Sequence, residues 1–296
     1  MRKVSYFFSI ALAASVIVAC TPKKAAVEEP VAPDFEFVIS GEATETEITT
    51  PEGLTYVEFN KPQVSNLAEA PKDKDGFITL FDGKSFNGWR AYDADTVPGR
   101  WSIDEGAFKV SGSGQGEAHA DDGGDLIFAH KFKNFELTFD WKVGKGSNSG
   151  IFYLAREIKG QNIWISSPEY QILDNVDHLD ANLGENGNRK SASLYDMIPA
   201  NPQNANPVGE WNTGAILVYK GTVVHKQNGK NVLEYHLWTP QWNERIADSK
   251  FKPGGDYPLA YGLLTNLGGE AHEGYIGLQD HGEDVWFKNI KIKILE

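Results

Sequence analysis

The segment Phe135-Glu-Leu-Thr-Phe-Asp-Trp-Lys-Val143 decides the fold class. Apolar side chains occupy its odd positions and polar side chains its even positions, a period of two that is typical of a half-buried antiparallel strand. We therefore expect Phe139 and Trp141 to lie between two packed sheets, and Glu136 and Asp140 to point the other way.

The same alternation recurs through most of the chain. At the C-terminal end, Ile290, Ile292 and Ile294 alternate with two lysines. Further strands are expected at residues 78–81, 101–104, 107–110, 150–155, 169–174, 215–219, 222–227, 232–237 and 275–280, separated by turn signals such as Asn228-Gly229. One helix is expected from Pro240 to about residue 250, capped by Thr239. This pattern predicts an all-β sandwich or jelly roll of two antiparallel sheets with one short helix.

Composition narrows the classes of partner. The chain has 296 residues, a length that one β-sandwich can account for, and its formal charge is 28 − 41 = −13. Such an acidic chain argues against nucleic acid or anionic lipid as a partner, because phosphate binding needs clustered Lys and Arg. Eight tryptophans in a glycine-rich, acidic chain favour sugar binding, although core packing is the ordinary use of such rings.

The N-terminal segment has the order of a bacterial lipoprotein signal. Basic Arg2 and Lys3 precede an apolar run at 4–18, and Ala19-Cys20 follows, which resembles a signal peptide with a lipobox. We expect 1–19 to be removed and Cys20 to carry lipid, giving a mature charge of 26 − 41 = −15. The protein would then be anchored in the cell envelope, with the outer membrane favoured, and lipid would be its one membrane contact.

Domain organisation follows from composition along the chain. Residues 20–74 are expected to form a tether and N-terminal extension, with short strands at 35–39 and 56–59, and residues 75–296 to form the functional domain. The single cysteine excludes an intramolecular disulfide and a CxxC pair.

Two strands carry polar side chains where a sugar could bind. Glu169 and Gln171 share one face of the strand at 169–174, and Asp174 and His178 follow at its end. A plain turn at Asp174 and a capping role for His178 are the alternative. Near the C-terminus, Gln279 and His281 also share a face, between two glycines.

Two further stretches carry candidate side chains. Residues 147–156 contain Asn148, Gly150 and Arg156, and a surface salt bridge is the alternative role for this arginine. Residues 186–196 read as an ordered loop that carries Tyr195.

Metal and nucleotide chemistry have little support in the sequence. The seven histidines show no HxH or HExxH spacing, and no GxSxG or Walker pattern occurs. Asp121, Asp122 and Asp125 could bind Ca²⁺, but a solvated turn is the favoured explanation. We therefore expect no metal ligands and no cofactor.

Several motifs together resemble one bacterial family. They are Leu80-Phe-Asp-Gly-Lys-Ser-Phe-Asn-Gly-Trp89, Asn148-Ser-Gly-Ile-Phe152, Glu169-Tyr-Gln-Ile-Leu-Asp-Asn175, Gly209-Glu-Trp-Asn-Thr213 and Gly277-Leu-Gln-Asp-His-Gly282 followed by Val285-Trp-Phe-Lys-Asn-Ile290. This order resembles the 3-keto-disaccharide hydrolase family, also called 3-keto-glucoside lyase and hydratase, formerly a domain of unknown function. Many members are lipoproteins of Bacteroidetes. The resemblance covers about 75–296 and implies a concanavalin A-like lectin/glucanase jelly roll that acts on 3-keto-glucosides.

The chemistry of a 3-keto sugar then sets the expected roles. A conventional glycosidase needs two carboxylates that flank the anomeric carbon. Glu169 and Asp174 are a poor pair for this role, because their strand parity differs. A 3-ketone instead acidifies the C2 proton, so one base, a donor to the enolate oxygen and an acid for the leaving group suffice. Elimination followed by hydration amounts to hydrolysis. The sequence does not distinguish a lyase, which would stop after elimination, from a hydrolase.

These roles are assigned to nine residues. We expect the catalytic groups to be Glu169, His281 and His178, and the substrate-binding groups to be Arg156, Gln171, Gln279, Asn148, Asp174 and Tyr195. Whether a carboxylate or an imidazole is the base stays open, with Arg156 and Gln171 expected at the keto oxygen. The alternative function is a non-catalytic, lectin-like module that binds glycans, because the fold permits both.

Overall fold

The computed structural model describes Met1 and residues 35–50, 52–113 and 122–296. The expected signal peptide, Cys20, the first part of the tether and Asp121 lie outside the described residues. Within the described ranges, no helix has the length and apolar character needed to cross a membrane.

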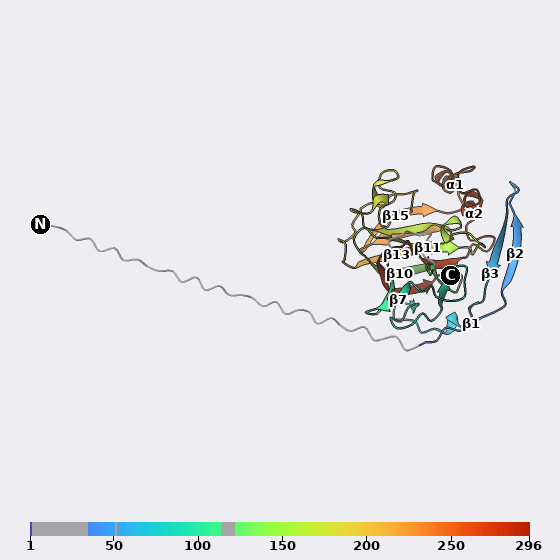
Figure 1. The fold of residues 1–296 in the computed structure, drawn as a ribbon, viewed down its shortest axis with the longest axis horizontal. Helices are drawn as coiled ribbons and strands as arrows, with labels where there is room; N and C mark the ends of the chain where they lie inside the picture. Colours follow the sequence, from blue (N-terminus) through green and yellow to red (C-terminus); the bar gives the residue numbers. More distant parts are fainter. Residues whose placement is uncertain (2–34, 51, 114–121) are drawn as a thin grey trace. The chain divides into compact units, whose positions relative to one another are not determined.

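Two antiparallel sheets form the body of residues 35–296 (Figure 1). The larger sheet has the order β15 (Lys230–His236), β14 (Thr222–Gln227), β13 (Asn212–Tyr219), β10 (Phe135–Val143), β17 (Val285–Ile294), β8 (Ala107–Val110) and β7 (Trp101–Asp104), with β5 (Ile78–Thr79) also paired to β17. The smaller sheet has the order β12 (Glu169–Leu173), β11 (Asn148–Ala155), β16 (Tyr275–Leu278), β9 (Leu126–Phe128) and β6 (Trp89–Ala91).

Shorter elements complete the described chain. Two small antiparallel pairs join β1 (Ile39–Ser40) to β4 (Gln63–Val64) and β2 (Thr44–Thr49) to β3 (Thr55–Asn60). The helices are α1 (Pro240–Ala247) and α2 (Ala260–Thr265), and single 3-10 turns occur at η1 (Leu67–Glu69), η2 (Ile163–Ile165) and η3 (Leu179–Asn182).

The strand that decided the fold class lies where it was expected. β10 spans the predicted residues, and its apolar side chains are buried while its polar ones are half-exposed. Phe139 packs edge-on against Tyr170 of the smaller sheet, with ring centroids 5.2 Å apart. Gly214 of β13 leaves room for the same ring, since a Cβ there would lie 2.2 Å from Phe139. The core therefore lies between the two sheets, and the prediction of a β-sandwich is confirmed.

The helix content differs from the expectation. α1 starts at Pro240 as predicted, and the Thr239 hydroxyl accepts a hydrogen bond from the backbone N–H of Trp242 at 3.2 Å. The expectation of a single helix was wrong, because α2 also forms, although no side chain caps its start. Such a short, uncapped segment gives no pattern in the sequence, and tertiary packing decides its conformation.

A buried histidine joins the two sheets inside this core. His225 of β14 donates from Nδ1 to the carbonyl oxygen of Ala192 at 3.0 Å, so its Nε2 accepts from the Tyr153 hydroxyl at 2.7 Å. Tyr153 in turn contacts the Tyr235 hydroxyl at 2.5 Å. Burial lowers the pKa of His225 to about 4, because the low-dielectric interior disfavours the charged imidazolium.

This histidine predicts a loss of stability in acid. Its folded-state pKa lies below the unfolded value of 6.5, so the unfolded chain binds the extra proton and stability falls as pH drops through that window. Between pH 7 and pH 5, the loss from this group should be about 2 kcal/mol. Urea unfolding of His225→Gln should show a correspondingly smaller loss than wild type, and the exposed His236→Gln should match wild type. Equal losses in all three proteins would contradict this account.

Candidate active site

A row of polar side chains lies on the outer face of the smaller sheet. The register pairs Gly150 of β11 with Gln171 of β12, and Phe152 with Glu169. Neighbouring strand residues of the other parity, among them Tyr170, belong to the core between the sheets. Strand alternation therefore places Glu169, Gln171 and Gly150 together, on the face away from the sandwich core.

Gly150 provides the floor on which the carboxylate rests. A Cβ at residue 150 would lie 2.1 Å from Oε1 of Glu169, so the carboxyl group sits directly over this glycine. On one side, Gln171 donates from Nε2 to Oδ1 of Asn148 at 2.8 Å. On the other, the backbone N–H of Gln279 donates to the Gly150 carbonyl at 2.9 Å. The structure thus brings four predicted residues together around one glycine.

These groups are almost completely withdrawn from solvent. Glu169 is 7% exposed, Gln279 4% and Gln171 0%. Within the described chain, Oε1 of Gln171 is buried and has no hydrogen-bond partner. A buried acceptor of this kind costs free energy unless a donor reaches it.

Two imidazoles lie beyond the ends of β16 and β12. His281 follows Gln279 by two residues, and its ring centroid is 5.6 Å from that of His178. Nδ1 of His281 lies 2.8 Å from Oε2 of Glu283, while Nδ1 of His178 accepts from the backbone N–H of Asp180 at 3.1 Å. Burial lowers the pKa of His178, and His281 beside it lowers it further.

Asp174 holds the turn that carries His178. Its carboxylate accepts hydrogen bonds from the backbone N–H groups of Gly146 and Val176 at 2.9 Å and of Asp177 at 3.2 Å. Burial alone would raise the pKa of Asp174, but these bonds outweigh it and hold the pKa below its usual range. The geometry favours the alternative reading of Asp174 as a turn residue, since its oxygens are already engaged.

Tyr195 lies beside Glu169 in the loop that follows η3. Its backbone N–H donates to the Glu169 carbonyl at 3.1 Å, and its hydroxyl donates to Oδ2 of Asp180 at 2.8 Å. Burial raises the pKa of Tyr195, and the charges of Asp180 and Glu169 raise it further. The loop therefore carries an aromatic side chain to the edge of the polar face.

No local pattern in the sequence indicates the aromatic group near Tyr195. Nζ of Lys250 lies 4.6 Å from the Tyr195 ring and 4.8 Å from that of Trp164. Trp164 also packs against the apolar cluster that contains Phe152, the strand partner of Glu169. These residues come from η2 and from loops without periodicity, so only the fold brings them to the same face.

Arg156 forms its side-chain hydrogen bonds away from the polar face. It follows β11 at the end opposite to Asn148, and its Nε donates to Oε1 of Glu58 at 3.2 Å. Nη2 donates to the Tyr56 hydroxyl at 2.9 Å. Arg156 is 5% exposed, and its guanidinium attaches β3 to the domain, so the structure does not bring it to the polar face.

The acidic segment before β9 is held against the strand end that carries His281. Oδ1 of Asp125 accepts from the backbone N–H of Asp280 at 2.9 Å, and Oδ2 of Asp280 accepts from Gly124 at 3.1 Å. Arg100 lies 3.3 Å from the other oxygen of Asp280. Asp280 and Asp125 therefore fix the position of the loop at 122–125 rather than converging on an ion.

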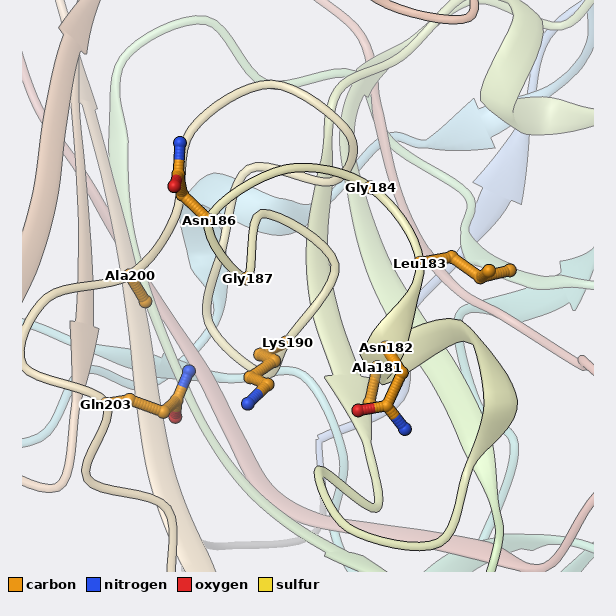
Figure 2. Close-up of a pocket in the computed structure, with 9 residues that line it drawn as sticks. All are labelled: Ala181, Asn182, Leu183, Gly184, Asn186, Gly187, Lys190, Ala200 and Gln203. Atoms are coloured by element: carbon orange, nitrogen blue, oxygen red, sulfur yellow. The ribbon is translucent and has the colours of Figure 1, made fainter.

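A distinct pocket lies within the loop that follows η3 (Figure 2). It encloses about 400 Å³ and is lined by Ala181, Asn182, Leu183, Gly184, Asn186, Gly187, Lys190, Ala200 and Gln203. Lys190 projects between Gln203 and Asn182 in this view. Its lining contains no carboxylate or imidazole, so it lacks the acid and base groups that the sheet face supplies.

Comparison with solved structures defines the class of protein first. A crystal structure of a candidate glycosyl hydrolase from Parabacteroides distasonis has a TM-score of 0.61 and 27% identity, covering 75% of this chain and 95% of that one. A second from the same organism has a TM-score of 0.52 and 26% identity, covering 71% and 100%. The fold is thus a jelly-roll sandwich of the kind found in these proteins.

Sequence comparison then gives the family. Residues 76–293 match the 3-keto-alpha-glucoside-1,2-lyase-like domain. Over 305 aligned residues the chain is 53% identical to the 3-keto-disaccharide hydrolase of Bacteroides thetaiotaomicron, with all of both chains covered. The protein belongs to this family of enzymes, which confirms the resemblance drawn from its motifs.

Substitution of Gly150 should reduce turnover without reducing the stability of the fold. In Gly150→Ala the new Cβ must displace the Glu169 carboxyl group, which is the far end of a flexible side chain, so the fold should tolerate it. We expect turnover to fall at least about 100-fold, because the carboxylate would lose its position, while thermal unfolding stays near wild type. Gly262→Ala, in open space on α2, is the matched control and should keep full activity. Full activity of Gly150→Ala would contradict the role of this floor.

Proposed function

We propose that this protein cleaves the glycosidic bond of 3-keto-glucosides and 3-keto-disaccharides. The observation that carries the proposal is the buried carboxylate of Glu169, seated on Gly150 between the amides of Gln171 and Gln279. Family membership supports the substrate class, since a full-length relative that is 53% identical is named for 3-keto-disaccharides. A site that combines one base with several amides suits proton abstraction next to a ketone.

Elimination fits these residues better than direct displacement. A conventional glycosidase places two carboxylates about 5–10 Å apart across the anomeric carbon. The carboxylate of Asp174 is engaged by three backbone N–H groups, and that of Asp280 by Arg100 and backbone N–H groups. A 3-keto sugar needs only one base to begin, because its ketone acidifies the proton on C2.

The proposed reaction has two stages. Glu169 takes the C2 proton, and the electron pair of that C–H bond forms the enolate. When the C3 carbonyl re-forms, the C1=C2 double bond forms and the C1–O bond to the aglycone breaks. The leaving aglycone oxygen takes up the proton held by Glu169. The amides of Gln171, Asn148 and Gln279 orient the sugar and stabilise the enolate oxygen. Water then adds to C1 while a proton returns to C2, so the sum of the two stages is hydrolysis.

Replacing the base tests this assignment. Glu169→Gln keeps the shape of the side chain and removes its ability to accept a proton, so kcat on a 3-keto-glucoside should fall at least about 100-fold. Substrate binding, measured by calorimetry, should largely persist. Glu136→Gln, which alters a half-buried carboxylate on the larger sheet, is the control and should stay within about twofold of wild type.

Two results would contradict the proposal. Turnover by Glu169→Gln within a few-fold of wild type would remove this residue from the chemistry. Binding of glycans without turnover of any 3-keto-glycoside by the wild type would favour a lectin-like module instead.

We also propose that the enzyme is held in the cell envelope by lipid on Cys20, with the outer membrane favoured. The support is the order of basic, apolar and small residues before this single cysteine. Mass spectrometry of the protein from its native host should find an acylated N-terminal Cys20. An intact peptide spanning residues 1–20 in the mature protein would contradict this anchor.

A further inference from the structure

Two histidines and a glutamate converge at the end of the polar face. His178, His281 and Glu283 each offer one ligand atom, and these atoms lie within 4.8 Å of one another. The histidines are 103 positions apart in the sequence, and the turn held by Asp174 brings the first to the second. Histidine spacing in the sequence could not indicate this cluster, because only the fold brings the three side chains together.

The donors have the chemistry of a transition-metal site. Two imidazoles with one carboxylate suit zinc, iron or cobalt, whereas Ca²⁺ prefers an all-oxygen shell. Nδ1 of His281 and Oε2 of Glu283, 2.8 Å apart, already lie about as close as two ligands of one ion, with a proton between them. All three side chains are partly exposed, so an ion could reach them.

The surroundings favour a positive ion. The carboxylate of Glu283 lies 2.8 Å from Nδ1 of His281, and the carboxylate of Asp174 accepts hydrogen bonds within the turn that carries His178. The loop at 122–125, which contains two more carboxylates, is hydrogen-bonded to the residue before His281. Part of the negative charge is balanced by Arg100, which pairs with Asp280.

We propose that His178, His281 and Glu283 bind one divalent transition-metal ion, of the zinc or cobalt kind. Coordination displaces the proton between His281 and Glu283. For His178, the ion takes Nε2, and the ring proton moves to Nδ1, which gives up its hydrogen bond from Asp180. One lost hydrogen bond is a small cost beside coordination of a transition metal.

The function of the ion rests on the proposed reaction, although its binding does not. His281 lies two residues beyond Gln279, whose backbone N–H donates to the carbonyl oxygen of Gly150. The carboxyl group of Glu169 lies over the same glycine, so the ion would lie beside the proposed site. A sugar ring over Gly150 would then present an oxygen to the metal. There the ion would act as a Lewis acid on the keto or the leaving oxygen.

Direct binding of Co²⁺ tests the site without substrate. The full-length protein is treated with a chelator, dialysed and titrated with Co²⁺ by calorimetry and visible absorption. We expect one Co²⁺ per chain, and an affinity at least about tenfold weaker in His281→Ala and in Glu283→Gln. The matched control is His236→Ala, which alters an exposed histidine that also lies beside a glutamate, and it should bind as wild type.

Other outcomes would contradict either the metal site or the proposed function. No stoichiometric Co²⁺ binding by the wild type, or equal binding by wild type and His281→Ala, would overturn the metal site. Thermal unfolding shows whether each variant is folded, and Glu283→Gln serves as the second test if His281→Ala is not. A protein that binds Co²⁺ at these residues but leaves 3-keto-glucosides intact would contradict the proposed function and leave the metal site standing.

Discussion

The contact between Phe139 and Tyr170 sets the orientation of everything built on the smaller sheet. Phe139 belongs to β10 and is buried, so its edge-on contact holds Tyr170 inside the sandwich. Successive residues of a strand point to opposite faces, and Glu169 and Gln171 must therefore point outward. A slip of one residue would bury the carboxylate in the apolar core, which the charge itself forbids.

The polar face depends as much on small residues as on functional ones. Gly150 and Gly277 stand on the outer face, and side chains there would meet Glu169 and Ile163 respectively. The aromatic and apolar cluster around Phe152 closes one end, and the histidine pair lies toward the other. The result is a small, largely buried polar surface with one carboxylate, three amides and two imidazoles. Such a set of hydrogen-bonding groups suits a sugar, which carries several oxygens.

Local patterns predicted the fold and part of the site. The alternation over residues 135–143 gave β10 to the residue, and parity alone placed Glu169 beside Gln171. Three-residue strands such as β6 and β9 are buried throughout and carry no alternation, so they were missed. The partner of Arg156 is Glu58, nearly a hundred residues away, and no local pattern records such a pair. Glu283 was not predicted for the same reason, because only the fold brings His178 close to it.

The central claim is that bond cleavage begins with loss of the C2 proton, and a 3-keto-glucoside deuterated at C2 tests it most directly. The account predicts a primary kinetic isotope effect on aglycone release and loss of the deuterium to solvent, both beyond the slow exchange of substrate without enzyme. Direct hydrolysis at C1 would leave the deuterium on C2 and show no primary effect. Retention of the label at full turnover would contradict the elimination mechanism and the role given to Glu169.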